Sequence, residues 1–147
     1  MYLICDIDGT LAIVPPERAE LAAKGDWARF YACDFAHDAP ISQTIAMVEA
    51  WLEAGGILVV VTSRRDTVRD ETWDWLRAQL PDMTAANTTL VMRKADDDRP
   101  ETAWKVAAVR TVCPKPSACL VLDDNAGACA ALASDGYTVL RVERGEA

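Results

Sequence analysis

The chain has 147 residues, the size of one ordinary domain with its own core. Hydrophobic residues make up 51% and charged residues 26%, a composition that excludes a disordered or low-complexity protein. The formal net charge of -8 argues against non-specific wrapping of nucleic acid. No apolar run is long enough for a membrane span, and Asp6 follows too early for a secretory signal. We therefore expect a cytoplasmic protein without membrane contact.

The cysteines and the single histidine limit the chemistry that the chain can carry. No C-x-x-C pair occurs, and we interpret the five cysteines as small buried hydrophobic residues. They are Cys5, Cys33, Cys113, Cys119 and Cys129. With His37 as the only histidine, the sequence argues against a usual zinc site and against a Ser-His-Asp triad. Catalysis would have to rely on carboxylates, lysine, arginine and hydroxyl groups.

The first half of the chain predicts two buried strands. Residues 2–5 form a short apolar run that favours a strand. Asp38 is a possible helix cap, and the apolar residues after Pro40 recur at helical spacing until residues 55–56, both glycine. Residues 57–61 are apolar on both faces, which is typical of a strand in a parallel sheet covered by helices.

The second half continues the alternation of helices and strands. Asp66 is a possible cap for a helix that Pro81 ends. The remaining expected elements are strands over 89–92, 118–122 and 137–142 and helices over 100–112 and 126–134. This order predicts an α/β three-layer sandwich with a mostly parallel, Rossmann-like sheet. We expect residues 1–147 to form one domain without a large cap domain.

Residues 11–39 fit the alternation least well. Four aromatic residues, Trp27, Phe30, Tyr31 and Phe35, lie there among charged residues. One interpretation is an irregular excursion that packs its aromatic side chains back onto the domain. The other is a flap or small insertion over a binding site, with an aromatic ring available to stack on a base.

Polar clusters stand at the ends of the apolar strands or just beyond them. They are Asp6-Ile7-Asp8-Gly9-Thr10, Thr62-Ser63-Arg64, Lys105 and Asp123-Asp124. Each cluster alone has an ordinary explanation, such as a turn, a helix cap or a solvated helix residue. In a parallel sheet, however, the carboxyl ends of the strands form one crevice where ligands bind. The joint occurrence of the four clusters therefore indicates a functional site.

The residue types indicate phosphoryl chemistry. Several carboxylates in one crevice repel one another and need a divalent cation, and ligands that are all oxygen favour Mg²⁺. Asp6 and Asp8 point the same way from extended backbone, so one can attack phosphorus while the other moves the proton. Thr62 and Lys105 would hold the phosphoryl oxygens.

The order and spacing of these motifs resemble the haloacid dehalogenase (HAD) superfamily of phosphotransferases over nearly the whole chain. The segments V-V-T-S-R at 60–64 and L-V-M-R at 90–93, with D-R-P at 98–100 and then Lys105, are similar to the phosphatase domain of phage polynucleotide kinase. Ser63 departs from this pattern, because the family usually has glycine there. A further arginine expected after the first motif has no clear counterpart.

The resemblance implies roles for individual residues. Asp6 would be the nucleophile and Asp8 the general acid and base. A Mg²⁺ ion would be held by the Asp6 carboxylate, the Asp8 main-chain carbonyl and Asp124, with Asp123 bound through water or orienting the lysine. Three arginines, Arg64, Arg93 and Arg99, are the expected substrate contacts, of which Arg64 and Arg99 would lie near the leaving group.

The expected function is a magnesium-dependent phosphomonoesterase that acts through an aspartyl-phosphate on 3′-phosphates of nucleic-acid ends. No G-x-x-x-x-G-K-[ST] run occurs, so only the phosphatase activity is inferred. An uncapped crevice favours a bulky polynucleotide end, whereas the acidic charge favours mononucleotides or other small phosphate esters. A receiver-like phosphoacceptor domain is a third possibility, which Asp8 argues against.

Basic residues after the second and third strands bear on substrate choice. They are Arg64, Arg65, Arg69, Arg93, Lys94 and Arg99. Such positions converge on one rim of the crevice, which predicts a track for the backbone phosphates of a nucleic acid. The alternative is that these residues only offset acidic neighbours on the surface.

Overall fold

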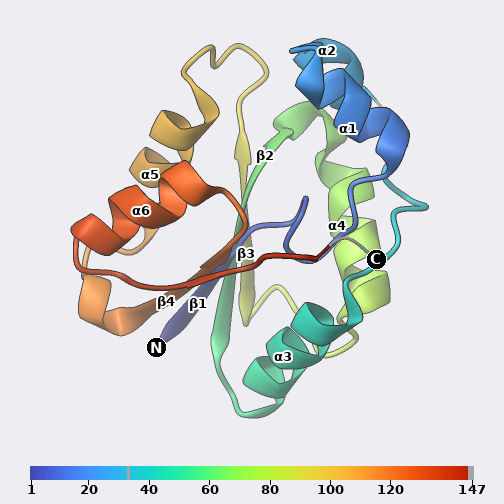
Figure 1. Ribbon diagram of the computed structural model, residues 1–147. Helices are drawn as coiled ribbons and strands as arrows, with labels where there is room; N and C mark the ends of the chain where they lie inside the picture. The colour runs from blue at the N-terminus through green and yellow to red at the C-terminus, as the bar shows by residue number, and fades with distance from the viewer. Residues whose placement is uncertain (33, 146–147) are drawn as a thin grey trace.

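A computed structural model describes residues 1–32 and 34–145 of the chain (Figure 1). Five strands form one sheet in the order β3-β2-β1-β4-β5, and every neighbouring pair is parallel. The strands are β1 (Tyr2–Cys5), β2 (Ile57–Arg65), β3 (Thr88–Arg93), β4 (Cys119–Asp123) and β5 (Thr138–Arg141). The parallel, Rossmann-like sheet that the sequence predicts is confirmed.

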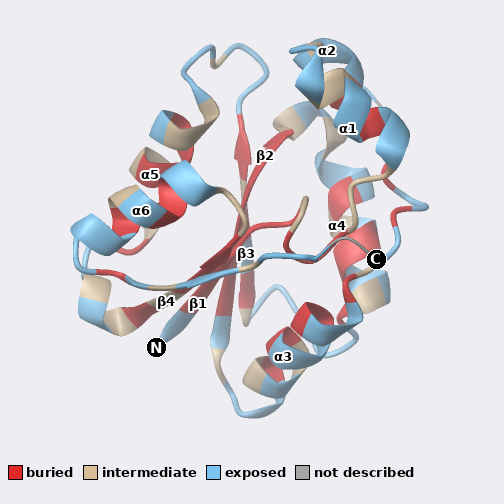
Figure 2. Ribbon diagram, viewed as in Figure 1, coloured by how far each residue is buried: buried red, intermediate tan, exposed pale blue. Residues whose placement is uncertain are grey.

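Helices cover both faces of this sheet, which gives the expected three layers (Figure 1). The helices α3 (Ser42–Glu53) and α4 (Arg69–Gln79) pack on one face, and α5 (Glu101–Val112) and α6 (Ala126–Ser134) on the other. Figure 2 shows the buried strands enclosed between the two helical layers. No large cap domain lies over the sheet in the described part of the chain.

The two cores follow from the alternation of side chains along each strand. In β1, Leu3 and Cys5 face the α3–α4 layer, whereas Ile4 faces the α5–α6 layer. In β2, Leu58 and Val59 divide between the two layers in the same way. Because both faces are buried, the strands read as continuous apolar runs.

The register of the central strands brings the polar clusters together. Cys5 pairs with Val60 of β2 and with Leu122 of β4. The next residues along the chain are therefore Asp6 after β1 and Asp123 in β4, with Thr62 close by in β2. This places the clusters at the same end of the sheet, as expected for parallel strands.

Residues 11–39 are more regular than the sequence suggests. Two helices, α1 (Pro16–Ala23) and α2 (Trp27–Phe30), stand beyond the carboxyl ends of the strands (Figure 1). Phe30, Tyr31 and Phe35 pack inward as a buried cluster, whereas Trp27 is exposed. The interpretation as an irregular excursion is therefore wrong where α1 and α2 form, and its packing is right for three of the four aromatic residues.

Two proposed helix caps are also wrong. Asp38 does not cap α3, which begins at Ser42 after an uncapped Ile41; its carboxylate is instead buried in ion pairs described below. Asp66 lies in a 3₁₀ turn (Asp66–Val68), where its carboxylate accepts a hydrogen bond from the Ala95 N–H at 3.2 Å. In both cases the carboxylate that was predicted to cap a helix instead binds a partner that is distant in the sequence.

The cysteines are buried, but not all of them are free thiols. Cys5 and Cys129 are free and buried, as expected. Cys113 and Cys119 are buried as expected, in the core on the α5–α6 side, and form a disulfide that the sequence did not predict. Cys33 lies outside the described residues. Within the part of the chain that the structure describes, no helix is long and apolar enough to cross a membrane.

Candidate active site

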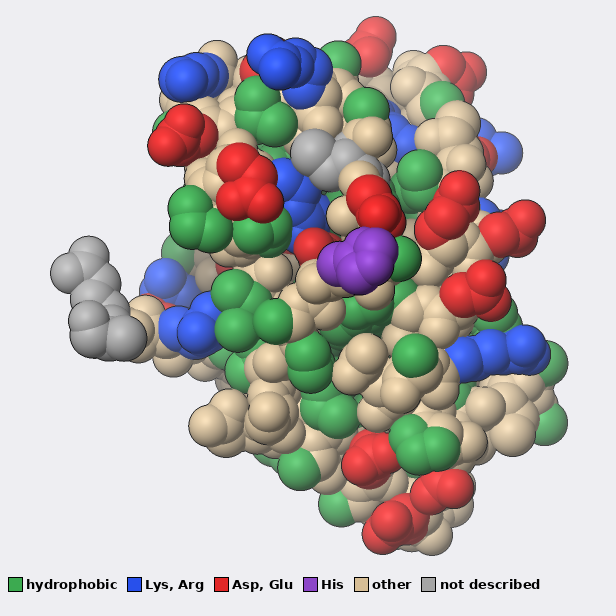
Figure 3. All heavy atoms as spheres, turned by 90° about the vertical axis from the view of Figure 1, so that its right-hand side faces the viewer, with side chains coloured by type: hydrophobic (Ala, Val, Ile, Leu, Met, Phe, Trp, Pro, Cys, Tyr) green, Lys and Arg blue, Asp and Glu red, His purple; other side chains and the backbone are tan. Residues whose placement is uncertain are grey.

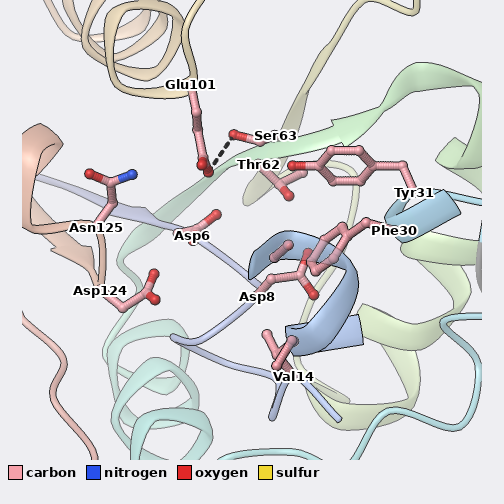
Figure 4. Close-up of a pocket in the computed structure, with 12 residues that line it drawn as sticks. Asp6, Asp8, Val14, Phe30, Tyr31, Thr62, Ser63, Glu101, Asp124 and Asn125 are labelled. Atoms are coloured by element: carbon pink, nitrogen blue, oxygen red, sulfur yellow. Dashed lines mark hydrogen bonds between the residues drawn. The ribbon is translucent and has the colours of Figure 1, made fainter. Parts of the chain in front are cut away.

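A pocket of about 290 Å³ opens where the polar clusters converge. Figure 4 shows Asp6, Asp8 and Asp124 projecting into one space from the loops that follow β1 and β4. The remaining lining residues are Val14, Ala19, Ala22, Phe30, Tyr31, Thr62, Ser63, Glu101 and Asn125. Asp6, Asp8, Thr62 and Asp124, which the sequence singled out, therefore share one cavity.

The loop after β1 is a tight turn. The Ile7 carbonyl accepts hydrogen bonds from the N–H groups of Thr10, Leu11 and Ala12, at 3.0, 2.8 and 2.9 Å. Gly9 has φ +85, and a Cβ on it would collide with the Asp124 carboxylate. Only glycine therefore allows this turn to approach the acidic residue of the neighbouring loop so closely.

Lys105 reaches Asp6 from α5. Its Nζ lies 3.1 Å from Oδ2 of Asp6, 3.1 Å from Oδ2 of Asp123 and 3.9 Å from Oε1 of Glu101. Although burial of this lysine opposes its charge, Asp6 and Asp123 raise its pKa above the ordinary value. Lys105 therefore stays protonated, buried beside Asp6 and Asp123.

Three carboxylates beside this lysine form a candidate cation site. Asp6, Asp123 and Asp124 each offer an oxygen, and these oxygens lie within 4.8 Å of one another. Burial raises the pKa of Asp6, and the nearby carboxylates of Asp123 and Asp124 raise it further, against the effect of Lys105. One ammonium group does not balance three carboxylates, so the set suits an additional cation.

The two aspartates of the last motif differ in their surroundings. Asp123 is buried, and its Oδ1 accepts hydrogen bonds from the Asn125 N–H at 2.8 Å and from Lys105 Nζ at 3.3 Å. Asp124 lines the pocket, and its Oδ1 accepts a hydrogen bond from the Thr10 hydroxyl at 3.4 Å. Asp124 is thus the more available of the two for a ligand.

Asp8 is held by a pair of buried arginines. Arg64 binds it in a bidentate fork, donating two hydrogen bonds: Nε lies 2.9 Å from Oδ2 and Nη2 lies 2.9 Å from Oδ1. Arg18 Nη2 lies 3.4 Å from Oδ1 of Asp8. Although burial raises the pKa of Asp8, Arg64 outweighs that effect and lowers it.

Asp38 and Phe35 complete this buried network. Oδ2 of Asp38 lies 2.6 Å from Nη2 of Arg18 and 3.0 Å from Nη2 of Arg64. The Phe35 ring centroid is 4.7 Å from Cζ of Arg18 and 4.0 Å from Cζ of Arg64. The Trp75 indole donates to the Asp38 carbonyl at 2.9 Å. The network ties α1, β2 and α4 to the position of Asp8.

The arginines predicted as substrate contacts occupy two different places. Arg64 is fully buried against Asp8 and does not line the pocket. Arg93 and Arg99 line a second pocket, which adjoins the first. Arg18 and Asp38 were not assigned to the site from the sequence. The one available signal was that Arg18 is the nearest arginine after the first motif.

The remaining predicted residues fit the pocket. The Thr62 hydroxyl oxygen accepts a hydrogen bond from the Arg64 N–H at 3.2 Å, and Ser63 donates to Glu101 Oε1 at 2.9 Å (Figure 4). No described residue other than glycine has a positive φ, so Ser63 causes no strain where the family usually has glycine. His37 lies on the acidic surface in Figure 3, beside Asp34, and does not line this pocket.

The sequence model of the family described as "Polynucleotide kinase PNKP phosphatase domain" matches residues 1–146. The chain belongs to this family. It is therefore an enzyme, a HAD-type phosphatase domain, and the receiver-like alternative is not supported. No curated protein matches the chain.

Solved structures share this fold at low sequence identity. A chain of the Pnkp1/Rnl/Hen1 complex is 18% identical with a TM-score of 0.70, covering 99% of this chain and 46% of its own. A HAD family enzyme from Bacteroides thetaiotaomicron is 12% identical with a TM-score of 0.61, covering 99% and 94%. L-2-haloacid dehalogenase from Xanthobacter autotrophicus is 16% identical with a TM-score of 0.61, covering 99% and 78%. These likenesses show the fold alone, and this chain spans less than half of the first structure's chain.

Proposed function

We propose that this phosphatase is a magnesium-dependent phosphomonoesterase that removes 3′-phosphates from nucleic-acid ends through an aspartyl-phosphate. One observation carries the proposal: the Asp6 carboxylate and the fork-held Asp8 project into the same pocket, with Lys105 3.1 Å from Asp6. This arrangement supports the roles of Asp6 as nucleophile, Asp8 as proton carrier and Lys105 as phosphate-binding cation.

The acidic cluster fits a magnesium ion. The donors are all oxygens, and three carboxylates face a single lysine. The Asp6 and Asp124 carboxylates and the Asp8 main-chain carbonyl would hold the ion, while Asp123 orients Lys105. Bound there, the ion would neutralise charge on the phosphoryl group. A HAD family structure with magnesium and inorganic phosphate, 13% identical with a TM-score of 0.53, supports this choice of metal.

Asp6 would form the covalent bond. An oxygen of its carboxylate attacks phosphorus, the phosphorus–oxygen bond to the 3′-carbon oxygen breaks, and that oxygen leaves with a proton from Asp8. Water then attacks the same phosphorus and gives its proton to Asp8. The bond between phosphorus and the Asp6 oxygen breaks, so phosphate is released and the Asp6 carboxylate is restored. Lys105 and the Thr62 hydroxyl would bind the phosphoryl oxygens throughout.

Arg64 fits a positioning role in this scheme. It lowers the pKa of Asp8, so the free enzyme carries Asp8 as a carboxylate. A phosphate dianion entering the pocket brings negative charge close to Asp8 and favours its protonated form. The arginine fork would hold the carboxyl group in place while its protonation changes, with Arg18 and Asp38 fixing the fork.

The open pocket favours a nucleic-acid end as substrate. The α1–α2 segment contributes Ala19, Phe30 and Tyr31 to one wall, and we propose that residues 11–39 act as a small insertion beside the site. No large cap closes over it in the described residues, so a chain can extend outward. A role in nucleic-acid repair in the cytoplasm would follow; one neighbour is titled an RNA repair complex. The acidic overall charge keeps small phosphate esters as the second candidate.

A substrate panel with magnesium tests the proposal. The probes are one oligonucleotide with a 3′-phosphate, the same oligonucleotide with a 5′-phosphate, a 3′-mononucleotide and 4-nitrophenyl phosphate. We expect the 3′-phosphorylated oligonucleotide to have the highest kcat/KM and the 5′-phosphorylated one to be nearly inert. Preference for the mononucleotide would support the small-ester function, and no hydrolysis of any probe would refute a phosphomonoesterase.

A further inference from the structure

A second pocket, of about 360 Å³, adjoins the active site. Tyr31 and Glu101 line both pockets, so they form a shared wall. On its other sides the second pocket has Trp27 of α2 and three arginines, Arg65, Arg93 and Arg99. A molecule whose terminal phosphate occupies the first pocket can therefore continue directly into the second.

Main-chain carbonyls, rather than carboxylates, hold two of these arginines in place. Arg65 Nη1 donates to the main-chain carbonyls of Lys94 and Asp97, each at 2.8 Å. Arg93 donates to the carbonyls of Asp97 and Arg99. Neither arginine forms an ion pair with a carboxylate of the described residues. Their guanidinium groups are thus oriented by neutral acceptors, with Arg65 half-buried and Arg93 buried in the wall of the pocket.

The acidic residues around this pocket have partners of their own, one of them an arginine of the lining. Asp97 pairs with Arg99 at 2.6 Å. Glu101 accepts a hydrogen bond from Ser63 at 2.9 Å and lies 3.9 Å from Lys105, on the side of the first pocket. Asp98 is the other acidic residue of the lining. The lining thus holds three arginines against Asp98 and Glu101. Because Asp97 neutralises Arg99, the guanidinium charges that have no carboxylate partner among the described residues are those of Arg65 and Arg93.

An aromatic ring stands beside these arginines. Trp27 is 43% exposed, and its ring is stacked on Tyr31, with centroids 6.3 Å apart and planes at 27°. Cζ of Arg65 lies 5.9 Å from the Tyr31 ring centroid. Exposed aromatic surface next to unpaired arginines is the combination that binds a nucleotide through its base and its phosphate.

We propose that the second pocket is the subsite for the nucleotide that precedes the 3′-terminal one. Arg65 and Arg93 bind the phosphodiester between the last two nucleotides, and Trp27 stacks on the base of the preceding nucleotide. This inference rests on the proposed action at nucleic-acid 3′-ends. It makes a dinucleotide the shortest fully recognised substrate. Every base can stack on an aromatic ring, and the phosphodiester is the same in every nucleotide. Recognition at this subsite is therefore independent of sequence.

The test compares thymidine 3′-phosphate with the thymidine dinucleotide that carries a 3′-phosphate. In the wild type we expect kcat/KM to be about tenfold higher for the dinucleotide, and rising salt to reduce this advantage. Trp27→Ala and Arg65→Ala should each bring the ratio of the two values towards one, whereas Trp27→Phe, which keeps an aromatic face, should retain it. Arg144→Ala, an arginine in the pocket on the other side of Asp124, is the matched control and should keep the ratio.

A third substrate separates stacking from charge. It is the same dinucleotide with the base of its first nucleotide removed, on which Trp27→Ala should have no effect while Arg65→Ala still lowers kcat/KM. Equal wild-type values for mononucleotide and dinucleotide would overturn the subsite and leave the proposed function intact. Loss of the ratio in Arg144→Ala would instead place the strand on the other side of the site and overturn the subsite. Hydrolysis of 4-nitrophenyl phosphate without hydrolysis of either nucleotide would overturn the proposed function, and the subsite with it.

Discussion

At the scale of single residues, the least expected feature is the pair of buried arginines behind Asp8. Arg18 is the most deeply buried residue of α1, and it lies on the same face as the partly buried Leu21 and Ala22. Its Nε and Nη1 have no hydrogen-bond partner among the described residues. Such a charge is tolerated because Asp8 and Asp38 lie against it and an aromatic ring covers it.

Arg18→Gln tests this network. The change leaves Asp38 buried with one arginine fewer, and removing one partner of a buried pair costs about 3–5 kcal/mol. Urea unfolding should show a loss of this size, and kcat/KM should fall because Asp8 is less firmly held. Lys24→Ala on the same helix is the control: its pair with Glu20 is exposed, so the free energy of unfolding should hardly change. Equal stability of the two variants would contradict a structural role for Arg18.

At the scale of elements, the strands and long helices were predictable because their apolar spacing reports burial directly. The helices over 100–112 and 126–134 were expected almost as they are found, at Glu101–Val112 and Ala126–Ser134. β2, however, runs on to Arg65, four residues past the expected end at 61. Its last residues are polar but buried, since they serve the site, and an apolar pattern does not mark them.

The missed helices have the same physical cause. α1 carries a proline at its first position and good helix formers after it, which is a usable signal. Its most buried side chain is charged, and Leu21 and Ala22 alone give too short an apolar pattern to identify an amphipathic helix. Asp38 likewise resembled a helix cap, because the residues around it in the sequence do not show that two distant arginines form ion pairs with its carboxylate.

The loop after β1 gives a prediction at this scale. Gly9→Ala should cost about 1–2 kcal/mol for the left-handed backbone, and in addition displace the Asp124 carboxylate. Gly55→Ala is the matched control, because Gly55 has φ +80 and a Cβ there meets no atom within 4 Å. Both variants should lose stability from this backbone strain in thermal unfolding, and only Gly9→Ala should lose most of its activity and magnesium response. An active Gly9→Ala enzyme would show that the close approach is not needed.

At the scale of the whole molecule, parallel order made the site predictable before its geometry was known. Polar clusters far apart in sequence had to meet at the carboxyl ends of the strands, and Asp6, Asp8, Thr62, Lys105 and Asp124 do so. The positions of the arginine side chains were harder to predict, since sequence order does not show which of them is buried. Arg64 is buried, whereas Arg65, Arg93 and Arg99 line a pocket.

The metal prediction concerns the folded molecule as a whole. An ion that binds only the native state raises the melting temperature, so Mg²⁺ should raise the Tm of the wild type and a chelator should reverse the rise. Activity should disappear and return with the same additions, and Ca²⁺ should bind with little turnover. Asp124→Asn should remove most of the Tm response. An unchanged Tm and full activity in the chelator would refute the site.

The central claim is that Asp6 becomes phosphorylated during turnover. The Asp8→Asn variant, which lacks the group that we propose activates water, should accumulate the intermediate when 4-nitrophenyl phosphate is the substrate, since that leaving group needs no proton. Mass spectrometry of acid-quenched enzyme should find one phosphoryl group, in the peptide that contains Asp6. Asp6→Asn should carry none and be inactive while remaining folded. A phosphoryl group on another residue, or turnover by Asp6→Asn, would contradict the account.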